Sequence, residues 1–178
     1  LKKKIINKEI DTVLVSLSDM QGRLTGKRAT GKAFLDYLKD ETHFCNYLFA
    51  VDMEMFTVPG FKSSSWETGY GDMTVKPDLK TIKVLPWLEK TALILSDCFE
   101  GDGKTPVYHS TRQILKEAIG KANSMGFQPM IGSELEFYLF NQTYDEIHNN
   151  NYKNLKESSW YIEDYMIFQT SKDEPYMR

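Results

Sequence analysis

The chain has 178 residues, of which 41% are hydrophobic and 26% are charged, and these proportions are ordinary for a folded globular protein. Its formal net charge of −3 disfavours a nucleic acid or an anionic membrane surface as the main partner. No apolar stretch approaches the length that spans a bilayer, and no signal-peptide pattern opens the chain, so we expect a cytoplasmic protein without a membrane partner. The two cysteines, Cys45 and Cys98, lie far apart without metal-site spacing, which indicates reduced core residues and not a disulfide framework.

The first fifty residues predict a hairpin, a helix and a third strand. Apolar and polar residues alternate over residues 12–18, and the same strand pattern returns over residues 24–30. Between them, Asp19–Gly22 predicts a turn, in which the aspartate bonds nearby backbone and the glycine takes a positive φ. Helical spacing over residues 31–39 predicts a short helix, and aromatic and β-branched residues over 45–51 predict the third strand.

Residues 53–86 predict mainly a long loop, because Pro-Gly and Gly-Tyr-Gly sequences interrupt them on either side of three serines. A loop of this length in a compact domain is usually functional or disordered, and Trp66 and Tyr70 favour packing over disorder. Two further strands are expected over residues 81–85 and 91–98. About five strands around one short helix indicate an α+β domain with a β-grasp-like sheet.

A Gly- and Asp-rich break at residues 100–104 predicts a domain boundary, so that one domain spans residues 1–104 and residues 105–178 open a second domain. Ser110 followed by Gln113 predicts a capping box at the start of an amphipathic helix, and Gly126 is expected to end it. The apolar stripe of this helix consists of Ile114, Leu115, Ala118, Ile119, Ala122 and Met125.

Two glutamates lie two positions apart within the otherwise apolar stretch Gly132–Phe140, which we expect to be a strand. Side chains alternate along a strand, so Glu134 and Glu136 would share one face, roughly 6.5–7 Å apart. No Lys or Arg lies between Pro129 and Asn141 to neutralise them. A hard divalent cation would relieve the repulsion between the two carboxylates, and the alternative is a solvated strand face with two unremarkable glutamates.

Several stretches stand out by their order and spacing along the chain: Asp19–Gly22 with Gly26–Arg28, Ser64–Asp72, Pro77-Asp78 with Pro86-Trp87, Arg112 with Leu115, and Gly132–Phe140. In these residues the chain resembles the N-terminal portion of the glutamine synthetase family, from about Thr12 to the C-terminus. Within the family, the chain looks similar to the branch that joins glutamate to amines larger than ammonia.

The resemblance implies a fold and a reaction. The fold is an N-terminal β-grasp domain followed by a glutamine-synthetase-type catalytic α/β domain, of which this chain holds only the opening segment. The reaction is that of an ATP-dependent ligase: ATP phosphorylates the γ-carboxylate of glutamate, and ammonia or a larger amine then displaces phosphate to give a γ-glutamyl amide. We expect the chain alone to be inactive, because the resemblance places the remaining metal ligands and the ATP-binding residues beyond Arg178.

The resemblance also implies cofactors, partners and site residues. Mg²⁺ or Mn²⁺ would neutralise phosphate charge, with Glu134 and Glu136 among the metal ligands. Family members assemble into homo-oligomeric rings, and the loop that reaches the neighbouring subunit's site would include four residues, Ser64, Ser65, Trp66 and Glu67.

One departure from the family pattern concerns the amine. Ammonia-using members carry an aspartate in the loop before the paired serines, whereas residues 59–63 contain no acid here. Glu67 and Asp72 are the candidate replacements, and the missing aspartate favours a bulkier amine. The alternative function is a non-catalytic structural or interaction member of the family, which retention of both Glu134 and Glu136 disfavours. A small β-rich binding module is a third and weaker alternative.

Overall fold

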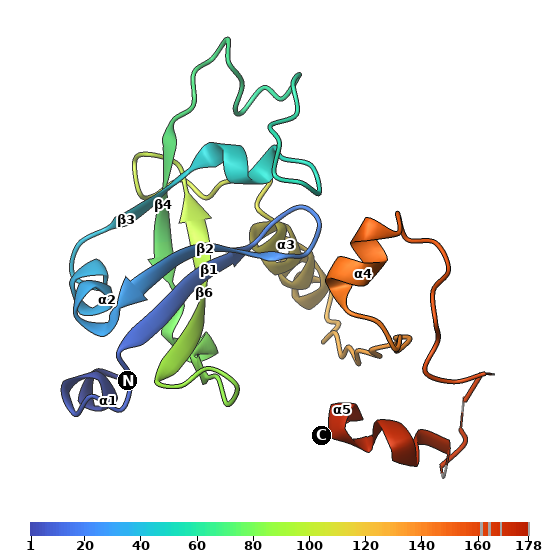
Figure 1. Cartoon of the computed structure of the whole chain (residues 1–178). Helices are drawn as coiled ribbons and strands as arrows, with labels where there is room; N and C mark the ends of the chain where they lie inside the picture. Colours follow the sequence, from blue (N-terminus) through green and yellow to red (C-terminus); the bar gives the residue numbers. More distant parts are fainter. Residues whose placement is uncertain (161, 164, 168, 178) are drawn as a thin grey trace. The chain divides into compact units, whose positions relative to one another are not determined.

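The computed structural model describes residues 1–160, 162–163, 165–167 and 169–177, which form two compact units, Leu1–Pro129 and Met130–Arg178. Figure 1 traces both units along the chain. The units divide at a later residue than the domain boundary predicted between residues 104 and 105, and that boundary stays a prediction. None of the described helices is long and apolar enough to cross a bilayer.

The first unit is built on a six-stranded mixed sheet in the order β2-β1-β6-β4-β3, with β5 also paired to β6 (Figure 1). β1 and β6 run parallel in the middle of the sheet, and the other pairs are antiparallel. The strands are β1 (Thr12–Ser18), β2 (Leu24–Thr30), β3 (Thr42–Cys45), β4 (Asp72–Pro77), β5 (Lys83–Val84) and β6 (Thr91–Phe99). This arrangement confirms the predicted α+β class.

Helices in the first unit are short except for one. They are α1 (Lys2–Ile6), α2 (Gly31–Tyr37) and α3 (Thr111–Ser124), with 3₁₀ turns η1 (Asn46–Phe49) and η2 (Leu79–Thr81). The second unit contains α4 (Tyr144–Asn149), η3 (Gln169–Asp173) and α5 (Glu174–Met177). The capping box of α4 joins Thr143 and Glu146 and stabilises the first turn of this helix.

The core lies where β1, β6 and β4 meet α2. Val13, Val15 and Leu17 on β1 are buried, as their alternation predicts, and they pack in one cluster with Phe34 of α2 and Ile94 of β6. The predicted hairpin is confirmed, since β1 and β2 pair from Thr12 with Thr30 to Ser18 with Leu24.

The predicted third strand over residues 45–51 is wrong. β3 ends at Cys45, and the chain turns into η1, where the Ala50 amide donates to the Tyr47 carbonyl oxygen. The Asn46 amide still donates to the Gly71 carbonyl oxygen, but its side chain turns to the loop and donates to Ser63. A short 3₁₀ turn and a side-chain bond to the loop therefore replace the ladder at this point.

The prediction of mainly loop over residues 53–86 is wrong in part, because it misses β4. Met73, Thr74 and Val75 are buried one after another, so both faces of the middle of β4 are covered. A strand buried on both faces lacks the alternation that identifies strands in sequence. The strand expected over 81–85 is confined to β5, and the one over 91–98 is confirmed by β6.

The predicted capping box at the start of α3 is wrong. Ser110 occupies the N-cap position, yet its buried side chain makes no capping bond, and the Gln113 side chain donates to Glu117 instead. The helix itself is confirmed, and Gly126 follows it with a φ of 85°.

Cys98 on β6 gives a pH-dependent test of this core. Both cysteines are free thiols, as predicted, and Cys98 is a core residue, but the predicted core position of Cys45 is wrong, since this residue is partly exposed at the end of β3. Burial raises the pKa of the Cys98 thiol to about 12. At a pH near 9, the ordinary pKa of a thiol, we expect iodoacetamide to alkylate Cys45 in the folded protein and Cys98 only after unfolding in urea.

Mass spectrometry of the cysteine peptides measures this difference. Because the folded-state pKa of Cys98 lies above the unfolded one, the free energy of unfolding should also fall as pH rises from about 9 towards 12. Equal alkylation of both thiols in the native protein would contradict the buried position of Cys98.

Candidate functional site

The loop that carries the predicted site residues begins at a clamp formed by the β1–β2 turn. The side chain of Asp19 is fully buried, and its Oδ1 accepts from the backbone amides of Gln21 and Arg23 at 3.0 and 2.8 Å. Its Oδ2 pairs with Arg23 Nε at 2.8 Å. The predicted turn and its aspartate bonds are confirmed, and Gly22 has the expected positive φ of 83°.

Arg23 connects this turn to the loop by hydrogen bonds. Its Nη1 donates to the Met53 carbonyl oxygen at 2.6 Å, and its Nη2 donates to the Asp52 carbonyl oxygen at 3.0 Å. The Gln21 amide group donates to the Val51 carbonyl oxygen at 2.8 Å. The first residues of the loop are therefore held by three hydrogen bonds from the hairpin.

Further along, the loop is shaped by its own hydroxyl groups. The Ser64 hydroxyl donates to the Asn46 side chain at 2.9 Å, and the Ser65 and Thr68 side chains each accept from the other residue's backbone amide at 3.1 Å. Gly69 closes the turn opposite Ser65, with a φ of 76°. These bonds support the expectation that the segment is packed rather than disordered.

Trp66 stands at the edge of a hollow of about 220 Å³ beside this turn. The Trp66 and Tyr70 rings meet edge to face at 5.0 Å between centroids, and Tyr47 contacts Tyr70 in the same manner at 6.2 Å. The hollow is lined by Thr57, Pro59, Ser65, Trp66, Glu67 and Tyr70.

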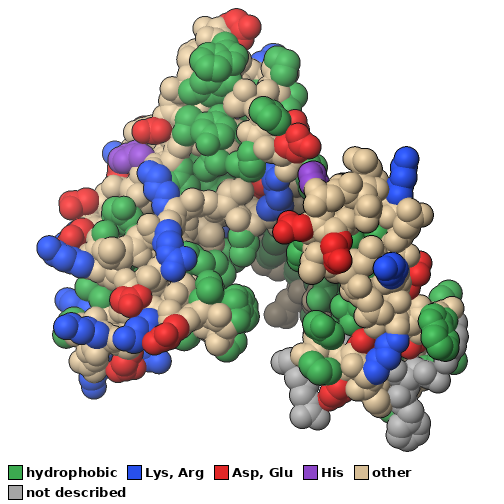
Figure 2. Space-filling view, in the orientation of Figure 1, with side chains coloured by type: hydrophobic (Ala, Val, Ile, Leu, Met, Phe, Trp, Pro, Cys, Tyr) green, Lys and Arg blue, Asp and Glu red, His purple; other side chains and the backbone are tan. Residues whose placement is uncertain are grey.

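The tip of the same loop is apolar. Hydrophobic side chains gather on the projection formed by the loop between η1 and β4 (Figures 1 and 2). The exposed ones are Met53, Met55, Phe56, Val58, Phe61 and Trp66, and Trp66 is 80% exposed. An apolar tip of this kind on a loop anchored at its base is typical of an interaction surface.

Of the two candidate replacements for the family's aspartate, only Glu67 reaches the hollow. Glu67 is exposed, and hydrogen bonds from the Ser65 side chain and from its own backbone lower the pKa of its carboxyl group. The carboxylate is therefore ionised at neutral pH. Asp72 is also exposed, but it opens β4 opposite Cys45 and does not line the hollow. Ser64 and Ser65 are buried, whereas Trp66 and Glu67 face solvent.

The second unit carries Glu134 and Glu136, and the strand predicted around them is wrong. Among the described residues, no strand pairs with Gly132–Phe140 apart from an isolated bridge between Phe140 and Glu157. Without a partner to accept and donate ladder hydrogen bonds, a stretch with strand-like alternation does not form a strand. Leu135, on the expected core face, is 87% exposed.

Both carboxylates remain available as oxygen ligands for a metal ion. Glu134 and Glu136 are exposed, and neither has a hydrogen bond or ion pair to another residue in the described part of the chain. Two carboxylates offer the hard oxygen atoms that Mg²⁺ and Mn²⁺ prefer, but they supply only part of a coordination shell. Across the described ranges, no three His, Cys, Asp or Glu side chains gather closely enough to hold a metal ion.

A second feature of the first unit is an ionic cluster at the start of α3. Arg112 Nε donates to Asp97 Oδ1 at 2.8 Å, and Arg112 Nη2 pairs with Asp78. Lys116, one turn later, pairs with Asp97 Oδ2 at 2.6 Å. The sequence singled out Asp78 and Arg112 without a role for them, and it missed Asp97 and Lys116. The one available signal was the spacing of Arg112 and Lys116, which places both on one helix face.

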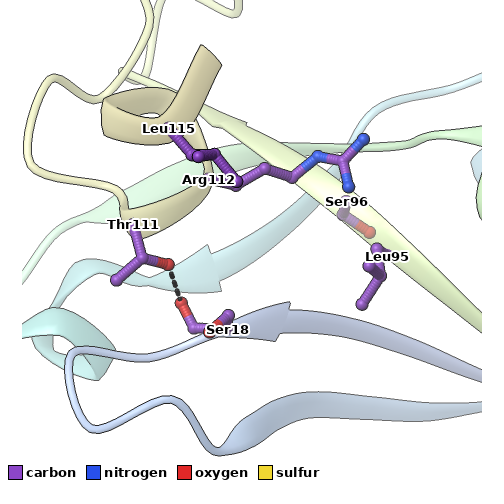
Figure 3. Close-up of a pocket in the computed structure, with 6 residues that line it drawn as sticks. All are labelled: Ser18, Leu95, Ser96, Thr111, Arg112 and Leu115. Atoms are coloured by element: carbon purple, nitrogen blue, oxygen red, sulfur yellow. Dashed lines mark hydrogen bonds between the residues drawn. The ribbon is translucent and has the colours of Figure 1, made fainter. Parts of the chain in front are cut away.

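This cluster borders a hollow of about 260 Å³ between α3 and the sheet. Figure 3 shows the Arg112 side chain reaching from α3 towards Ser96 on β6, and Leu95 and Leu115 also line the hollow. The Thr111 hydroxyl donates to the Ser18 carbonyl oxygen at 2.8 Å, which joins α3 to the end of β1 (Figure 3). The first turn of α3 is therefore fixed to two strands.

Comparisons with known proteins agree with these motifs. A family model described as "Glutamine synthetase, catalytic domain" matches residues 108–177. Gamma-glutamylethanolamide synthetase of Streptomyces coelicolor is 42% identical over 171 residues, which cover 96% of this chain and 37% of that protein. Glutamate–isopropylamine ligase of a Pseudomonas species is 34% identical, over 82% of this chain and 32% of that protein.

The chain belongs to the glutamine synthetase family. Type-1 glutamine synthetase 2 of Dictyostelium discoideum is 31% identical to this family member, over 93% of the chain and 32% of that protein. The chain spans about a third of the length of these curated relatives.

Solved structures of similar fold include a ligand-free GmaS. It has a TM-score of 0.54 and 21% identity, and the match covers 70% of this chain and 26% of that one. A structure described as a novel glutamine synthase homolog has a TM-score of 0.53 and 16% identity, over 65% of this chain and 27% of that one. These likenesses show a glutamine-synthetase-like fold for this family member.

Arg112 should be the stabilising member of its cluster. Replacing it with alanine leaves the partly buried carboxylates of Asp78 and Asp97 close to one another without their shared partner. We expect Arg112→Ala to lower the free energy of unfolding by about 1–3 kcal/mol. Urea denaturation of the chain measures the change.

The matched control is Lys116→Ala, on the same helix face. Lys116 is 46% exposed, so its pair with Asp97 should contribute less than about 1 kcal/mol. Equal losses in the free energy of unfolding for the two variants would show that Arg112 contributes no more to stability than Lys116.

Proposed function

We propose that this chain is the N-terminal part of an ATP-dependent glutamate–amine ligase. In the proposed reaction, the γ-carboxylate of glutamate attacks the terminal phosphorus of ATP and releases ADP. The amine then attacks the γ-glutamyl phosphate, phosphate leaves with the bonding electron pair, and the nitrogen loses a proton to give the amide. The observation that carries the proposal is the 42% identity to a γ-glutamylethanolamide synthetase along 96% of the chain.

An amine larger than ammonia is favoured by two further observations. The relatives at 42% and 34% identity are named for ethanolamide and isopropylamine products or substrates. Residues 59–63 contain no acid, whereas the loop beyond them presents Glu67 beside two aromatic rings. Glu67, rather than Asp72, is the proposed partner for the amine, because only Glu67 lines the hollow.

The proposed domain and assembly also follow the family. A β-grasp domain is supported by the hairpin β1–β2, followed by α2, with the last strand β6 parallel to β1. A homo-oligomeric ring is supported by the apolar loop tip, which includes Met53, Phe56 and Trp66 and offers a surface for a neighbouring subunit. In this proposal, Ser64 and Ser65 hold the loop, while Trp66 and Glu67 face the neighbour.

Glu134 and Glu136 are proposed as ligands for Mg²⁺ or Mn²⁺. The support is chemical: both side chains are exposed oxygen donors without a cationic partner among the described residues. A bound divalent ion would neutralise negative charge on the phosphate groups. The two glutamates would hold the ion in place and, through their own negative charge, would favour a divalent cation over a monovalent one.

An assay of the complete protein tests the proposed function. Purified enzyme is supplied with ATP, glutamate and one of several amines, and γ-glutamyl amide is measured by mass spectrometry together with phosphate release. We expect product with ethanolamine or isopropylamine at rates above those with ammonia. The absence of amine-dependent phosphate release would instead favour a non-catalytic member, and equal turnover with ammonia without gain from larger amines would overturn the preference.

Substitution of the paired glutamates tests the metal proposal. Glu134→Gln and Glu136→Gln keep the side-chain volume but remove one negative charge each from the ligand set. In the complete enzyme, each should raise the Mn²⁺ concentration for half-maximal activity by about tenfold or more. Glu157→Gln, an exposed glutamate of the same unit, is the control and should leave this concentration unchanged. An unchanged metal dependence in the two variants would exclude both residues as ligands.

A further inference from the structure

One end of the first unit carries an excess of lysine. The start of β1, the end of β2 and the turn between β5 and β6 meet there, because the Asp11 and Thr12 amides donate to the Lys90 carbonyl oxygen and the Gly31 amide donates to the Asp11 carbonyl oxygen. We call residues 1–11, 30–32 and 84–90 the basic end (Figure 1). Its lysines are Lys2, Lys3, Lys4, Lys8, Lys32 and Lys90, and its acids are Glu9, Asp11 and Glu89.

The charge of this end is opposite to that of the rest of the chain. The chain has 22 basic and 25 acidic residues in all, so acids outnumber bases outside the basic end. Figure 2 shows blue side chains gathered over the lower part of the first unit, where Figure 1 places α1 and α2. The six lysines are exposed, and in the described part of the chain none of them has an ion pair, a side-chain hydrogen bond or a ring contact.

Two of the lysines occupy positions where the backbone favours glycine. Lys8 and Lys90 have positive φ angles of 60° and 51°, a conformation that glycine adopts without the steric cost that a side chain adds. Lys2, Lys3 and Lys4 are consecutive, so their like charges also repel one another. Because the fold gains no contact from these side chains, we infer that their charges act on a partner outside the chain.

Exposed apolar side chains lie among the lysines. Ile6 on α1 is 65% exposed, and Trp87 at the β5–β6 turn is 74% exposed. Leu1 and Ile5 pack against the core and thereby fix α1 to the unit. Pro86-Trp87 is one of the motifs of the sequence, and neither residue has a part in the proposed ligase reaction. Tryptophan is enriched at the centres of protein interfaces, whereas charged residues lie at their rims.

The distribution of charge favours a short acidic segment of another protein over a larger polyanion. An anionic membrane or a nucleic acid extends beyond the basic end and would also meet the acidic remainder of the chain, whereas a short segment meets the lysines alone. The basic end contains no arginine, which is the residue that binds phosphate groups in a bidentate manner. An aromatic residue within the segment would pack on the exposed ring of Trp87.

We propose that the basic end is a docking surface for an acidic protein segment, with Trp87 as its apolar anchor. The lysines attract and orient the segment, and Trp87 supplies the contact area that holds it. This inference does not depend on the ligase proposal, because no residue of the basic end lines the hollow beside Trp66 or belongs to the stretch around Glu134.

Fluorescence anisotropy with labelled peptides tests the docking surface. The first peptide has about nine residues, in which glutamates flank a central phenylalanine, and it spans roughly 30 Å when extended. The second peptide contains glutamate only, and the third has serine in place of each glutamate. We expect saturable binding of the first peptide to the 178-residue chain, weaker binding of the second and none of the third. Higher ionic strength should weaken the binding.

Lysine variants test the contribution of charge. Combined Lys3→Gln, Lys4→Gln and Lys90→Gln should raise the dissociation constant for the first peptide by about threefold to thirtyfold. The matched control removes the same charge from exposed lysines outside the basic end, and it should leave the dissociation constant unchanged. It combines Lys62→Gln, Lys104→Gln and Lys121→Gln.

A tryptophan variant tests the anchor. Trp87→Ser should raise the dissociation constant for the phenylalanine peptide by about fivefold and leave that for the all-glutamate peptide unchanged. The replaced side chains are exposed, so the variants should fold, and urea denaturation checks this. In nuclear magnetic resonance spectra of the chain, the phenylalanine peptide should shift the indole N–H signal of Trp87 but not those of Trp66 and Trp160.

Several outcomes would overturn the proposal. Equal losses of affinity in the two lysine variants, or equal affinities of the two acidic peptides for the unchanged chain, would remove the basis for this surface. Tighter binding of phosphatidylserine vesicles or single-stranded DNA than of the phenylalanine peptide would assign the basic end to a different class of partner. Binding by the chain that is lost in the complete protein would show that the basic end is covered there.

Discussion

The buried carboxylate of Asp19 is the constraint on which the arrangement of the site loop depends. A charge without exposure to water is costly unless hydrogen bonds and a counter-ion replace its hydration. Asp19 obtains these from two backbone amides of its own turn and from Arg23. Because the remaining guanidinium nitrogens reach the carbonyl groups of Asp52 and Met53, the interaction that satisfies Asp19 also fixes the start of the loop.

Arg112 has a comparable role at the start of α3. It joins the first turn of α3 to Asp97 on β6 and to Asp78 beside η2. Both arginines thus hold a segment that carries family motifs against the same sheet, and both use the planar fork of the guanidinium group, which lysine lacks. These two segments are therefore positioned by ion pairs in addition to the apolar core.

Local interactions explain which elements could be predicted. The β1–β2 hairpin, α2, β6 and α3 follow from alternation, helical spacing and turn residues within a few positions of one another. β4 could not be predicted in this way, because burial on both faces removes alternation, and η1 replaces a predicted strand because the Asn46 side chain bonds to a distant loop. The stretch around Glu134 has strand alternation but no pairing strand among the described residues, so the sequence pattern alone predicts a strand that does not form.

By itself, the sequence determined the chemistry that this protein carries: the family, the paired acids Glu134 and Glu136, and the aromatic and acidic residues of the Ser64–Asp72 loop. Only the tertiary structure decided which of those residues meet. It brings Glu67 to Trp66 and Tyr70 and leaves Asp72 at the start of a strand. The physical reason is that a turn closed by the Ser65 and Thr68 hydroxyl groups reverses the chain between these residues, and such side-chain bonds depend on packing that linear spacing does not encode.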